Sequence, residues 1–359
     1  MHVVLAGGGT AGHIEPALNT ADAIRARDCG YTLSVLGTER GLETTLVPAR
    51  GYELTLIPAV PLPRRINKDL FTLPHRLRAA INRVEAHLIA TNADVVVGFG
   101  GYVAIPAYLA ARRAGVPIVV HEANAKPGLA NRIGARFATA VVDTVAGSIA
   151  GARTLGLPLR FAIRTFNKEQ ARAAAIETWQ LSADKPTILV FGGSQGARHL
   201  NEVVAESAPS LIAQGFQILH SVGRNNLDQM VTGVPGYVTV AYIDRMDFAY
   251  GIADVAVTRA GAMTVAELTA VGLPALYVPL PIGNGEQRLN AQEVVQAGGG
   301  VLIDDADFNS GVLLSALSQM RTRGLEEMSK AAAACGHLND VDTFVDIIFD
   351  AAKTRKASS

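Results

Sequence analysis

The N-terminal sequence is His2-Val3-Val4-Leu5-Ala6 followed by Gly7-Gly8-Gly9-Thr10-Ala11-Gly12, and it indicates the fold because the same arrangement returns later in the chain. The second copy is Thr187-Ile188-Leu189-Val190-Phe191 followed by Gly192-Gly193-Ser194-Gln195-Gly196. In each copy an apolar run typical of a strand enters a glycine-rich turn, and a helical pattern follows. The repeat predicts two domains that each begin with a strand, a glycine-rich loop and a helix.

A second module is repeated in the same order. Asp94–Val97 precedes a glycine-rich turn, a helix and Gly115-Val116-Pro117, and Asp254–Val257 precedes a similar turn, a helix and Gly272-Leu273-Pro274. Strand and helix patterns alternate throughout, which is typical of α/β folds with parallel sheets. We therefore expect two Rossmann-like domains whose parallel sheets face a central cleft.

The chain length agrees with two domains. It has 359 residues, 49% of them hydrophobic, and single cores stop growing at roughly 250–300 residues. We expect an N-terminal domain at 1–160, a C-terminal domain at 161–339, and a helix at about 340–359 that packs back on the first domain. The join at 150–168 lacks a strand pattern. Uninterrupted apolar runs, typical of parallel strands, predict strands at 2–6, 32–36, 95–97, 118–120, 140–142, 187–191, 217–221, 255–257 and 275–278.

Charge and cysteine content narrow the range of functions. Lys and Arg number 32 and Asp and Glu number 32, so the chain lacks the basic field typical of nucleic-acid binding, and we expect no nucleic-acid partner. Cys29 and Cys335 form no zinc motif. Glycines and a proline interrupt the uncharged run 95–111, which therefore indicates a buried strand and helix start instead of a membrane span. We expect a cytoplasmic protein with peripheral membrane contact.

The first glycine-rich loop admits more than one function. Gly7–Gly12 satisfies G-x-G-x-x-G, a pattern of dinucleotide-dependent oxidoreductases, and Glu39 lies near the place where such enzymes need an acidic residue. Glycines let the backbone approach a ligand, and a helix N-terminus offers N–H groups to an anion. A tight turn without a ligand and a non-catalytic nucleotide-binding module are further alternatives.

His13 directly follows this loop. The partial positive charge of a helix N-terminus disfavours an imidazolium, and a neutral imidazole can accept a proton from an acceptor hydroxyl. His13 is therefore a candidate general base, and the alternative is a histidine that only caps or packs.

Three other polar stretches follow predicted strands, where ligands bind in open α/β sheets. Thr258–Glu267 begins a helix that can bind a phosphate, and Glu267 can either hold a ribose diol or remain a solvated carboxylate. Gly283–Asn290 is either part of the ligand site or a surface loop. His121–Asn124 suits sugar hydroxyls, with an internally paired structural set as the alternative.

Together these motifs resemble the MurG family of bacterial N-acetylglucosaminyltransferases over nearly the whole chain. The motifs that carry the resemblance are Gly-Gly-Thr-Ala-Gly-His (8–13), Gly-Phe-Gly-Gly-Tyr-Val (98–103), His-Glu-Ala-Asn (121–124), Gly-Gly-Ser-Gln-Gly-Ala (192–197) and the block 258–292.

The resemblance implies a GT-B fold and a UDP-GlcNAc-dependent hexosyltransferase. The expected reaction is an inverting transfer of N-acetylglucosamine from UDP-N-acetylglucosamine to lipid I, the undecaprenyl-diphosphate-linked muramyl-pentapeptide. Its product is lipid II in peptidoglycan synthesis. The enzyme would act as a peripheral protein at the cytoplasmic face of the bacterial inner membrane. The acceptor would bind the first domain and the donor the second.

The resemblance also assigns residues to the substrates. In the first domain these are Thr10, Ala11 and Gly12 of the first loop, Asn124 on the sugar and Arg160 near the join. In the second domain the resemblance implies uracil at Ile243, diphosphate at Ser194, sugar at Gln287, and a diphosphate- and ribose-binding helix made of Ala262, Met263, Thr264, Val265, Ala266 and Glu267.

Three positions depart from the family pattern. Ala11 stands where many members have glycine, Ser221 where many have glutamine, and Glu286 where a second glutamine is common. Ala11 adds a methyl group beside the expected acceptor diphosphate. These departures put contact details in question more than activity, because Gln287 remains.

Charge stabilisation of the leaving diphosphate is expected from helix N-termini at Ser194 and Ala262 and from the guanidinium of Arg160. No DxD-like carboxylate cluster lies near these loops, so we expect neither a metal nor a cofactor. Basic and apolar residues mix between Leu62 and Arg83. This stretch is expected to contact an anionic membrane surface, with a solvated basic face as the alternative.

Overall fold

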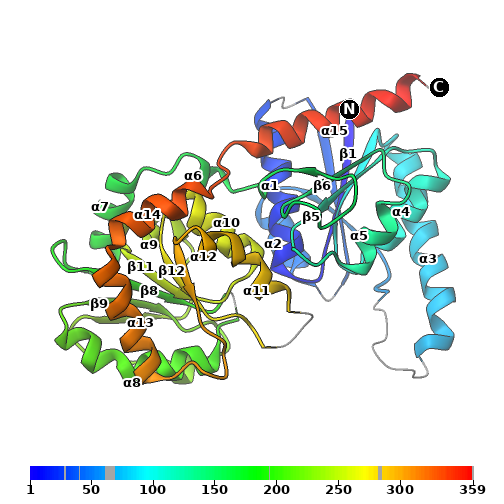
Figure 1. Ribbon diagram of the computed structural model, residues 1–359. Helices are drawn as coiled ribbons and strands as arrows, with labels where there is room; N and C mark the ends of the chain where they lie inside the picture. The colour runs from blue at the N-terminus through cyan, green and yellow to red at the C-terminus, as the bar shows by residue number, and fades with distance from the viewer. Residues whose placement is uncertain (28–29, 40, 61–68, 194, 282–284, 358–359) are drawn as a thin grey trace. The chain divides into compact units, whose positions relative to one another are not determined.

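The chain forms two units, each built around its own sheet. The computed structural model describes residues 1–27, 30–39, 41–60, 69–193, 195–281 and 285–357 (Figure 1). Unit 1 comprises Met1–Phe161 and Asn339–Ser359, and unit 2 comprises Ala162–Leu338.

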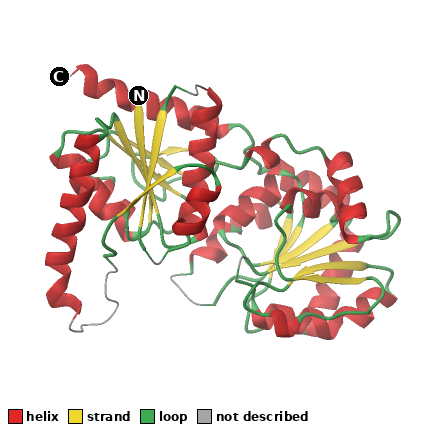
Figure 2. Ribbon diagram, turned by 180° about the vertical axis from the view of Figure 1, so that it is seen from behind, coloured by secondary structure: helices red, strands yellow, loops and turns green. Residues whose placement is uncertain are grey.

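Unit 1 contains a seven-stranded sheet in which all paired strands are parallel (Figure 2). The strand order is β3-β2-β1-β4-β5-β6-β7. The strands are β1 (His2–Gly7), β2 (Thr32–Gly37), β3 (Glu53–Leu56), β4 (Val95–Gly100), β5 (Ile118–Glu122), β6 (Ala140–Asp143) and β7 (Arg153–Thr154). The helices are α1 (Ala11–Arg27), α2 (Glu43–Ala49), α3 (Asp69–Ala90), α4 (Ala104–Arg113), α5 (Leu129–Gly134) and α15 (Asp340–Ala357).

The central strands of unit 1 are buried on both faces, as their apolar sequences predict. Along β1, Val3 and Leu5 belong to one hydrophobic core, and Val4 and Ala6 belong to the other. Helices α1 and α15 pack into the first core, and α3 and α4 pack into the second. Each fully buried Val or Leu side chain stabilises the fold by about 1.5–3 kcal/mol. The two cores therefore hold β1 in the interior of the sheet.

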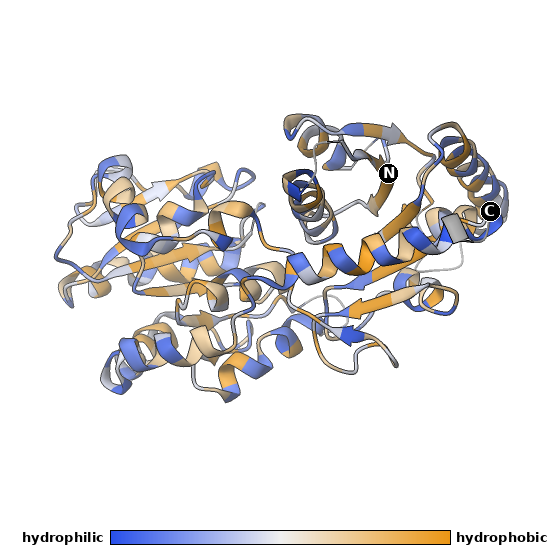
Figure 3. Cartoon of the chain, turned by 90° about the horizontal axis from the view of Figure 1, so that it is seen from above, coloured by the Kyte–Doolittle hydropathy of each residue, from blue (hydrophilic) through white to orange (hydrophobic). Residues whose placement is uncertain are grey.

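The last helix, α15, belongs to unit 1 and lies along α1 (Figure 1). Polar and apolar residues alternate along it, as expected for a helix with one buried face (Figure 3). Arg27, at the end of α1, forms an ion pair with Asp346 of α15. The apolar face lies in the first core and comprises Val341, Phe344, Val345 and Ile348.

Unit 2 contains a six-stranded parallel sheet of order β10-β9-β8-β11-β12-β13. Its strands are β8 (Thr187–Phe191), β9 (Gln217–Ser221), β10 (Tyr237–Val240), β11 (Val255–Thr258), β12 (Ala275–Tyr277) and β13 (Gly300–Leu302). Its helices are α6 (Phe161–Arg164), α7 (Lys168–Trp179), α8 (Arg198–Ala213), η1 (Leu227–Gln229), α9 (Met246–Ile252), α10 (Ala262–Ala270), α11 (Glu286–Asn290), α12 (Gln292–Gln296), α13 (Ser310–Arg323) and α14 (Leu325–Ala334).

The stretch 150–168 differs from the expectation that it lacks a strand. It contains β7, which pairs with β6 through only two residues, Arg153 and Thr154. Both residues are exposed, so the strand has no apolar pattern by which a sequence could reveal it.

In both sheets the strand order reverses beside the first strand of the unit. The reversal lies between β1 and β4 in unit 1 and between β8 and β11 in unit 2. Ligands of open α/β sheets bind outside the carboxyl ends of the strands at this point. The two glycine-rich loops follow β1 and β8, so the repeated motif lies at the point of strand-order reversal in each unit.

Candidate functional site

The first glycine-rich loop is locked against the turn that follows β4. Gly101 has a φ of +81°, and a Cβ at this position would lie 2.1 Å from the carbonyl oxygen of Gly8. Only glycine tolerates both the positive φ and this close approach. The ends of β1 and β4 therefore define one rigid surface at the reversal point of unit 1.

Glu43, at the start of α2, supports this loop and is fully buried. One carboxylate oxygen accepts a hydrogen bond from the Gly9 N–H at 3.1 Å. The other accepts from the N–H and the hydroxyl of Thr38, at 2.8 and 2.9 Å. The Gly9 N–H is therefore used within the protein. Glu39, the acidic residue that a dinucleotide site would need, is exposed.

His13 lies in the first turn of α1 and is half-buried. Its Nδ1 lies 3.0 Å from the hydroxyl oxygen of Thr10, and its backbone N–H donates to the Thr10 carbonyl at 3.1 Å. The ring packs against Gly100, where a Cβ would lie 3.0 Å from Cδ2 of His13. Thr10 and Gly12 are exposed and Ala11 is half-buried, so this turn is accessible to a ligand.

The pKa of His13 is lowered from 6.5, chiefly by burial. The negative charge of Glu122 and a hydrogen bond with the Gly8 backbone raise the pKa but do not overcome burial. His13 is therefore neutral at neutral pH, as a general base requires. The neutral state agrees with the expectation from the helix N-terminus, but burial is its leading cause.

Glu122, the last residue of β5, organises the loop that contains Asn124. One carboxylate oxygen accepts from the N–H of Asn124 at 2.9 Å and from its side-chain amide at 3.3 Å. The other accepts from the Gly128 N–H and the Asn131 side chain, both at 3.0 Å. The paired structural set that was one alternative for this motif thus includes Glu122, and it holds the half-buried Asn124 in place.

His121 lies in the interior of unit 1 and is 1% exposed. Its ring centroid lies 5.5 Å from that of Phe99 and 5.0 Å from that of Phe344 on α15. Burial lowers its pKa to about 4, so the residue is neutral. These contacts favour a structural role for His121, with Phe99 and Phe344 as its neighbours instead of Glu122.

Arg160 ends a segment that is tied to unit 1. The Asn19 side chain donates to the Pro158 carbonyl at 2.8 Å, and the Gly156 N–H donates to the Asp340 carboxylate at 2.7 Å. Arg160 itself is half-buried. The structure thus places this predicted donor-binding arginine on unit 1, at its boundary with unit 2 in the sequence.

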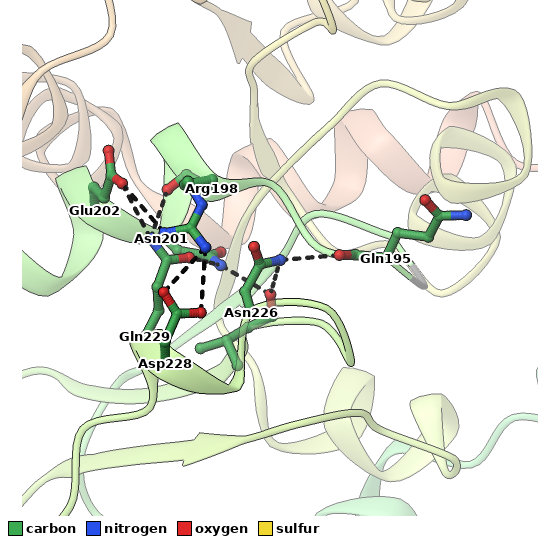
Figure 4. Close-up of polar contacts among 8 residues, drawn as sticks. Gln195, Arg198, Asn201, Glu202, Asn226, Asp228 and Gln229 are labelled. Atoms are coloured by element: carbon green, nitrogen blue, oxygen red, sulfur yellow. Dashed lines mark hydrogen bonds and ion pairs between the residues drawn. The ribbon is translucent and has the colours of Figure 1, made fainter.

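The second glycine-rich loop is held by Asn226 (Figure 4). The Asn226 side chain donates to the carbonyl oxygens of Gln195, at 2.9 Å, and Val222, at 3.1 Å. Gly196 has a φ of +79°, and a Cβ there would lie 2.0 Å from the Val222 carbonyl oxygen. The loop is therefore pinned to the segment after β9. Ser194, the predicted diphosphate ligand, lies outside the described residues.

Polar side chains of α8 also bind the segment that follows β9 (Figure 4). The Asn201 side chain donates to the Val222 carbonyl and to the Gln229 side chain, both at 2.8 Å. Arg198 forms an ion pair with Asp228 at 3.0 Å. These contacts join α8 to η1, the short helix that directly follows Asn226.

Helix α10 presents its N-terminus at the carboxyl end of β11, the reversal point of unit 2. The first N–H groups of a helix lack an intrahelical acceptor and attract anions. The predicted block Ala262–Glu267 forms the first six residues of this helix. Glu267 is 3% exposed and accepts a hydrogen bond from the Tyr250 hydroxyl at 2.8 Å, so it is not a solvated carboxylate.

Gln287 lies on α11 and supports the turn before α10. Its side-chain oxygen accepts from the backbone N–H groups of Ala260, at 3.2 Å, and Leu280, at 3.0 Å. The Asn290 side chain donates to the Ala260 carbonyl at 3.3 Å. Gln287 is therefore close to the α10 N-terminus. Ile243, after β10, is buried.

The sequence patterns did not indicate Glu43, Asn226 or Tyr250. Each acts through a hydrogen bond to a residue 17 or more positions away, namely Gly9, Gln195 and Glu267. Such pairings depend on tertiary structure. The position of Glu43 after the second strand was the only available signal.

Neither a metal cluster nor a membrane span is present in the described part of the chain. No group of three or more His, Cys, Asp or Glu side chains there could hold a metal ion. No helix among these residues is long and apolar enough to cross a membrane.

The chain matches known glycosyltransferases along almost its entire length. Residues 3–143 match the glycosyltransferase family 28 N-terminal domain, and residues 187–344 match the family 28 C-terminal domain. The UDP-N-acetylglucosamine–N-acetylmuramyl-(pentapeptide) pyrophosphoryl-undecaprenol N-acetylglucosamine transferase of Streptomyces avermitilis is 57% identical over 99% of both chains. That of Acidothermus cellulolyticus is 53% identical over 99% of both.

The fold comparison agrees. The crystal structure of Acinetobacter baumannii MurG has a TM-score of 0.78 at 28% identity, covering 97% of this chain and 99% of that one. The predicted fold class, with two parallel-sheet α/β domains of the GT-B glycosyltransferase type, is confirmed. The oxidoreductase alternative is wrong, and the use of the Gly9 N–H by Glu43 gives a local reason. The chain is an enzyme of the MurG family, the N-acetylglucosaminyltransferases of glycosyltransferase family 28.

Proposed function

We propose that this enzyme transfers N-acetylglucosamine from UDP-N-acetylglucosamine to lipid I, with inversion at the anomeric carbon. The names of its relatives supply the two substrates. The observation that carries the proposal is the position of His13, half-buried beside the first glycine-rich loop with a lowered pKa and with Nδ1 3.0 Å from the Thr10 hydroxyl oxygen. A neutral imidazole at a ligand-binding strand end suits proton removal from an acceptor hydroxyl.

The donor binds at the β8–β11 reversal point of unit 2. The diphosphate lies at the α10 N-terminus, from Ala262 to Ala266, and at Ser194 of the second loop. Glu267 accepts hydrogen bonds from the ribose hydroxyls, and uracil lies at Ile243. Gln287, beside the α10 N-terminus, binds the sugar. The support for this placement is the general rule for open α/β sheets together with the buried position of Glu267.

The acceptor binds unit 1 at the β1–β4 reversal point. Thr10, Ala11 and Gly12 present the first turn of α1 to the substrates, and Asn124, held by Glu122, contacts the transferred sugar. The acceptor oxygen forms a bond with the anomeric carbon while the bond from that carbon to the UDP oxygen breaks. His13 takes the proton of the acceptor hydroxyl, and the electron pair leaves with UDP.

Fixed dipoles and a cation stabilise the negative charge that develops on the leaving UDP. The α10 N-terminus carries partial positive charge, and Arg160 adds a guanidinium. With these groups we propose that transfer requires no metal and no cofactor. The rate should therefore be unchanged when EDTA is added to the assay.

The enzyme works as a peripheral protein on the cytoplasmic face of the bacterial inner membrane. The lipid anchor named in its relatives and the basic residues of α3 support this placement. Arg78 and Arg83 on α3 are exposed. Leu62–Lys68, the other half of the predicted membrane stretch, lies outside the described residues.

The transfer assay tests the proposal. The full chain is incubated with UDP-N-acetylglucosamine labelled in the sugar and with a lipid I analogue. The expected result is label in the lipid product, with a β linkage and stoichiometric UDP. Free labelled sugar without lipid product, or an α linkage, would refute the proposed reaction. UDP binding without turnover would favour the non-catalytic nucleotide-binding module.

A further inference from the structure

Tyr250 is a buried tyrosine whose hydroxyl ends at the carboxylate of Glu267. Tyr250 lies on α9 and is 2% exposed. Its hydroxyl donates to Oε2 of Glu267 at 2.8 Å, and Glu267 on α10 is 3% exposed. The hydrogen bond therefore joins α9 and α10, the helices that precede and follow β11.

A glutamate needs such a partner to present a fixed pair of oxygens. The terminal torsion of a Glu side chain is broad, so packing alone does not set the plane of its carboxylate. Each carboxylate oxygen can accept more than one hydrogen bond. The Tyr250 hydroxyl at Oε2 therefore restricts the plane of the carboxylate.

The position of Tyr250 is itself set by the core. Its ring centroid lies 6.3 Å from that of Phe191, the last residue of β8. The neighbouring Gly251 lies so close to α7 that a Cβ there would lie 2.5 Å from the Cβ of Ala171. Helix α9 therefore has little freedom to move, and the hydroxyl is held at a fixed place relative to β8.

We propose that Tyr250 is a positioning residue that orients the Glu267 carboxylate toward the two ribose hydroxyls of the donor nucleotide. This rests on the proposed role of Glu267 in ribose binding. Tyr250 does not touch the substrate. It acts on specificity, because a correctly oriented carboxylate can accept hydrogen bonds from a vicinal diol and gains nothing from a ribose without hydroxyls.

Calorimetry with two probes tests this role. The full chain and its Tyr250→Phe variant are titrated with UDP and with 2′,3′-dideoxyuridine 5′-diphosphate. The Tyr250→Phe variant should bind UDP about tenfold more weakly, the usual scale for coupling within one hydrogen-bond network. Its affinity for the dideoxy probe should stay within about twofold of wild type. In steady state the KM for the donor should rise while kcat is nearly unchanged.

Tyr237→Phe is the matched control. Tyr237 is also buried in unit 2, and its hydroxyl lies 2.8 Å from Nδ1 of His220, away from Glu267. This variant should leave the UDP-to-dideoxy ratio unchanged. If Tyr250→Phe weakens both probes equally, or leaves the ratio at its wild-type value, Tyr250 only supports the fold and the proposal is overturned.

A third variant separates this outcome from failure of the proposed function. Glu267→Ala should weaken UDP by about 10- to 150-fold and abolish the preference for UDP over the dideoxy probe. If wild type shows no such preference and Glu267→Ala binds UDP normally, the ribose assignment is wrong and the Tyr250 proposal falls with it. If Glu267→Ala loses the preference and Tyr250→Phe retains it, only the Tyr250 proposal fails.

Discussion

The carboxylate of Glu122 raises the pKa of His13, although the two residues lie on different elements of unit 1, β5 and α1. Burial acts in the opposite direction and is the larger effect. The position of the carboxylate is fixed by the N–H groups of Asn124 and Gly128. Glu122 therefore moderates the loss of basicity that burial imposes on His13.

Replacing Glu122 by Gln should move the acid limb of the pH–rate profile to lower pH. A neutral amide no longer stabilises the imidazolium, so the pKa of His13 falls further below 6.5. The measurement is kcat/KM against pH for both enzymes. The exposed carboxylate of Glu326 offers a control, because Glu326→Gln should leave the limb in place. An acid limb that is unchanged in Glu122→Gln, or that moves to higher pH, would contradict the effect of Glu122 on the pKa of His13.

Asn226→Ala should weaken donor binding. The variant loses the hydrogen bonds that pin the Gln195 and Val222 carbonyls, so the second glycine-rich loop is less ordered before UDP binds. One or two lost hydrogen bonds correspond to a rise of about 2- to 20-fold in the KM for the donor. Asn225→Ala removes an exposed neighbour and is the control. Equal KM values for the two variants would show that Asn226 does not order the second glycine-rich loop for donor binding.

Membrane adhesion should depend on charge. Co-sedimentation with vesicles should require anionic lipid and should fade at high salt, because a single basic and apolar patch binds weakly. Arg78→Glu combined with Arg83→Glu, on exposed positions of α3, should abolish binding. The same charge change at Arg321 and Arg323 of α13 should have little effect. Equal binding to neutral vesicles would rule out the electrostatic component.

Acid should destabilise both units through buried histidines. Burial lowers the pKa values of His121 and His220 to about 4, against 6.5 when unfolded. The unfolded chain therefore binds more protons between about pH 6.5 and pH 4. The stabilisation from keeping these rings neutral is complete above pH 6.5 and is lost as pH falls. At pH 5 each of these histidines should lower the free energy of unfolding by roughly 2 kcal/mol relative to neutral pH.

Urea denaturation at pH 7.5 and pH 5 measures this loss. In a folded His121→Gln variant, the contribution of His121 to the pH dependence of the unfolding free energy should disappear. The contribution of His220, in unit 2, should remain. An unfolding free energy that is equal at the two pH values would show that the buried histidines are not held neutral.

The repeated loops could be predicted from sequence because the backbone geometry at these turns requires glycine. Gly101, in the turn that packs against the first loop, and Gly196, in the second loop, combine positive φ values with carbonyl oxygens about 2 Å from a hypothetical Cβ, so no other residue fits. The strand before each loop is an uninterrupted apolar run. The general rule for open α/β sheets then predicts candidate sites at the ends of β1, β8 and β11, and the strand order reverses beside β1 and β8.

The strands β3, β7, β10 and β13 escaped prediction for the opposite reason. All are short, and most of their residues are exposed or half-buried, so they lack the long buried apolar run that marks strands such as β1 and β8. They form because a neighbouring strand offers a ladder of hydrogen bonds. Side-chain pairs such as Tyr250 and Glu267 likewise have no sequence period, because only the packed core brings them together.

The kcat of His13→Ala at saturating acceptor shows whether His13 acts as a general base. General-base assistance is worth about 10²–10⁴-fold in rate, so kcat should fall by that factor while UDP affinity stays near wild type. Loss confined to acceptor KM would mean that His13 only orients the lipid diphosphate. A His13→Ala enzyme with near-normal kcat at saturating acceptor would contradict the general-base mechanism and leave the family assignment intact.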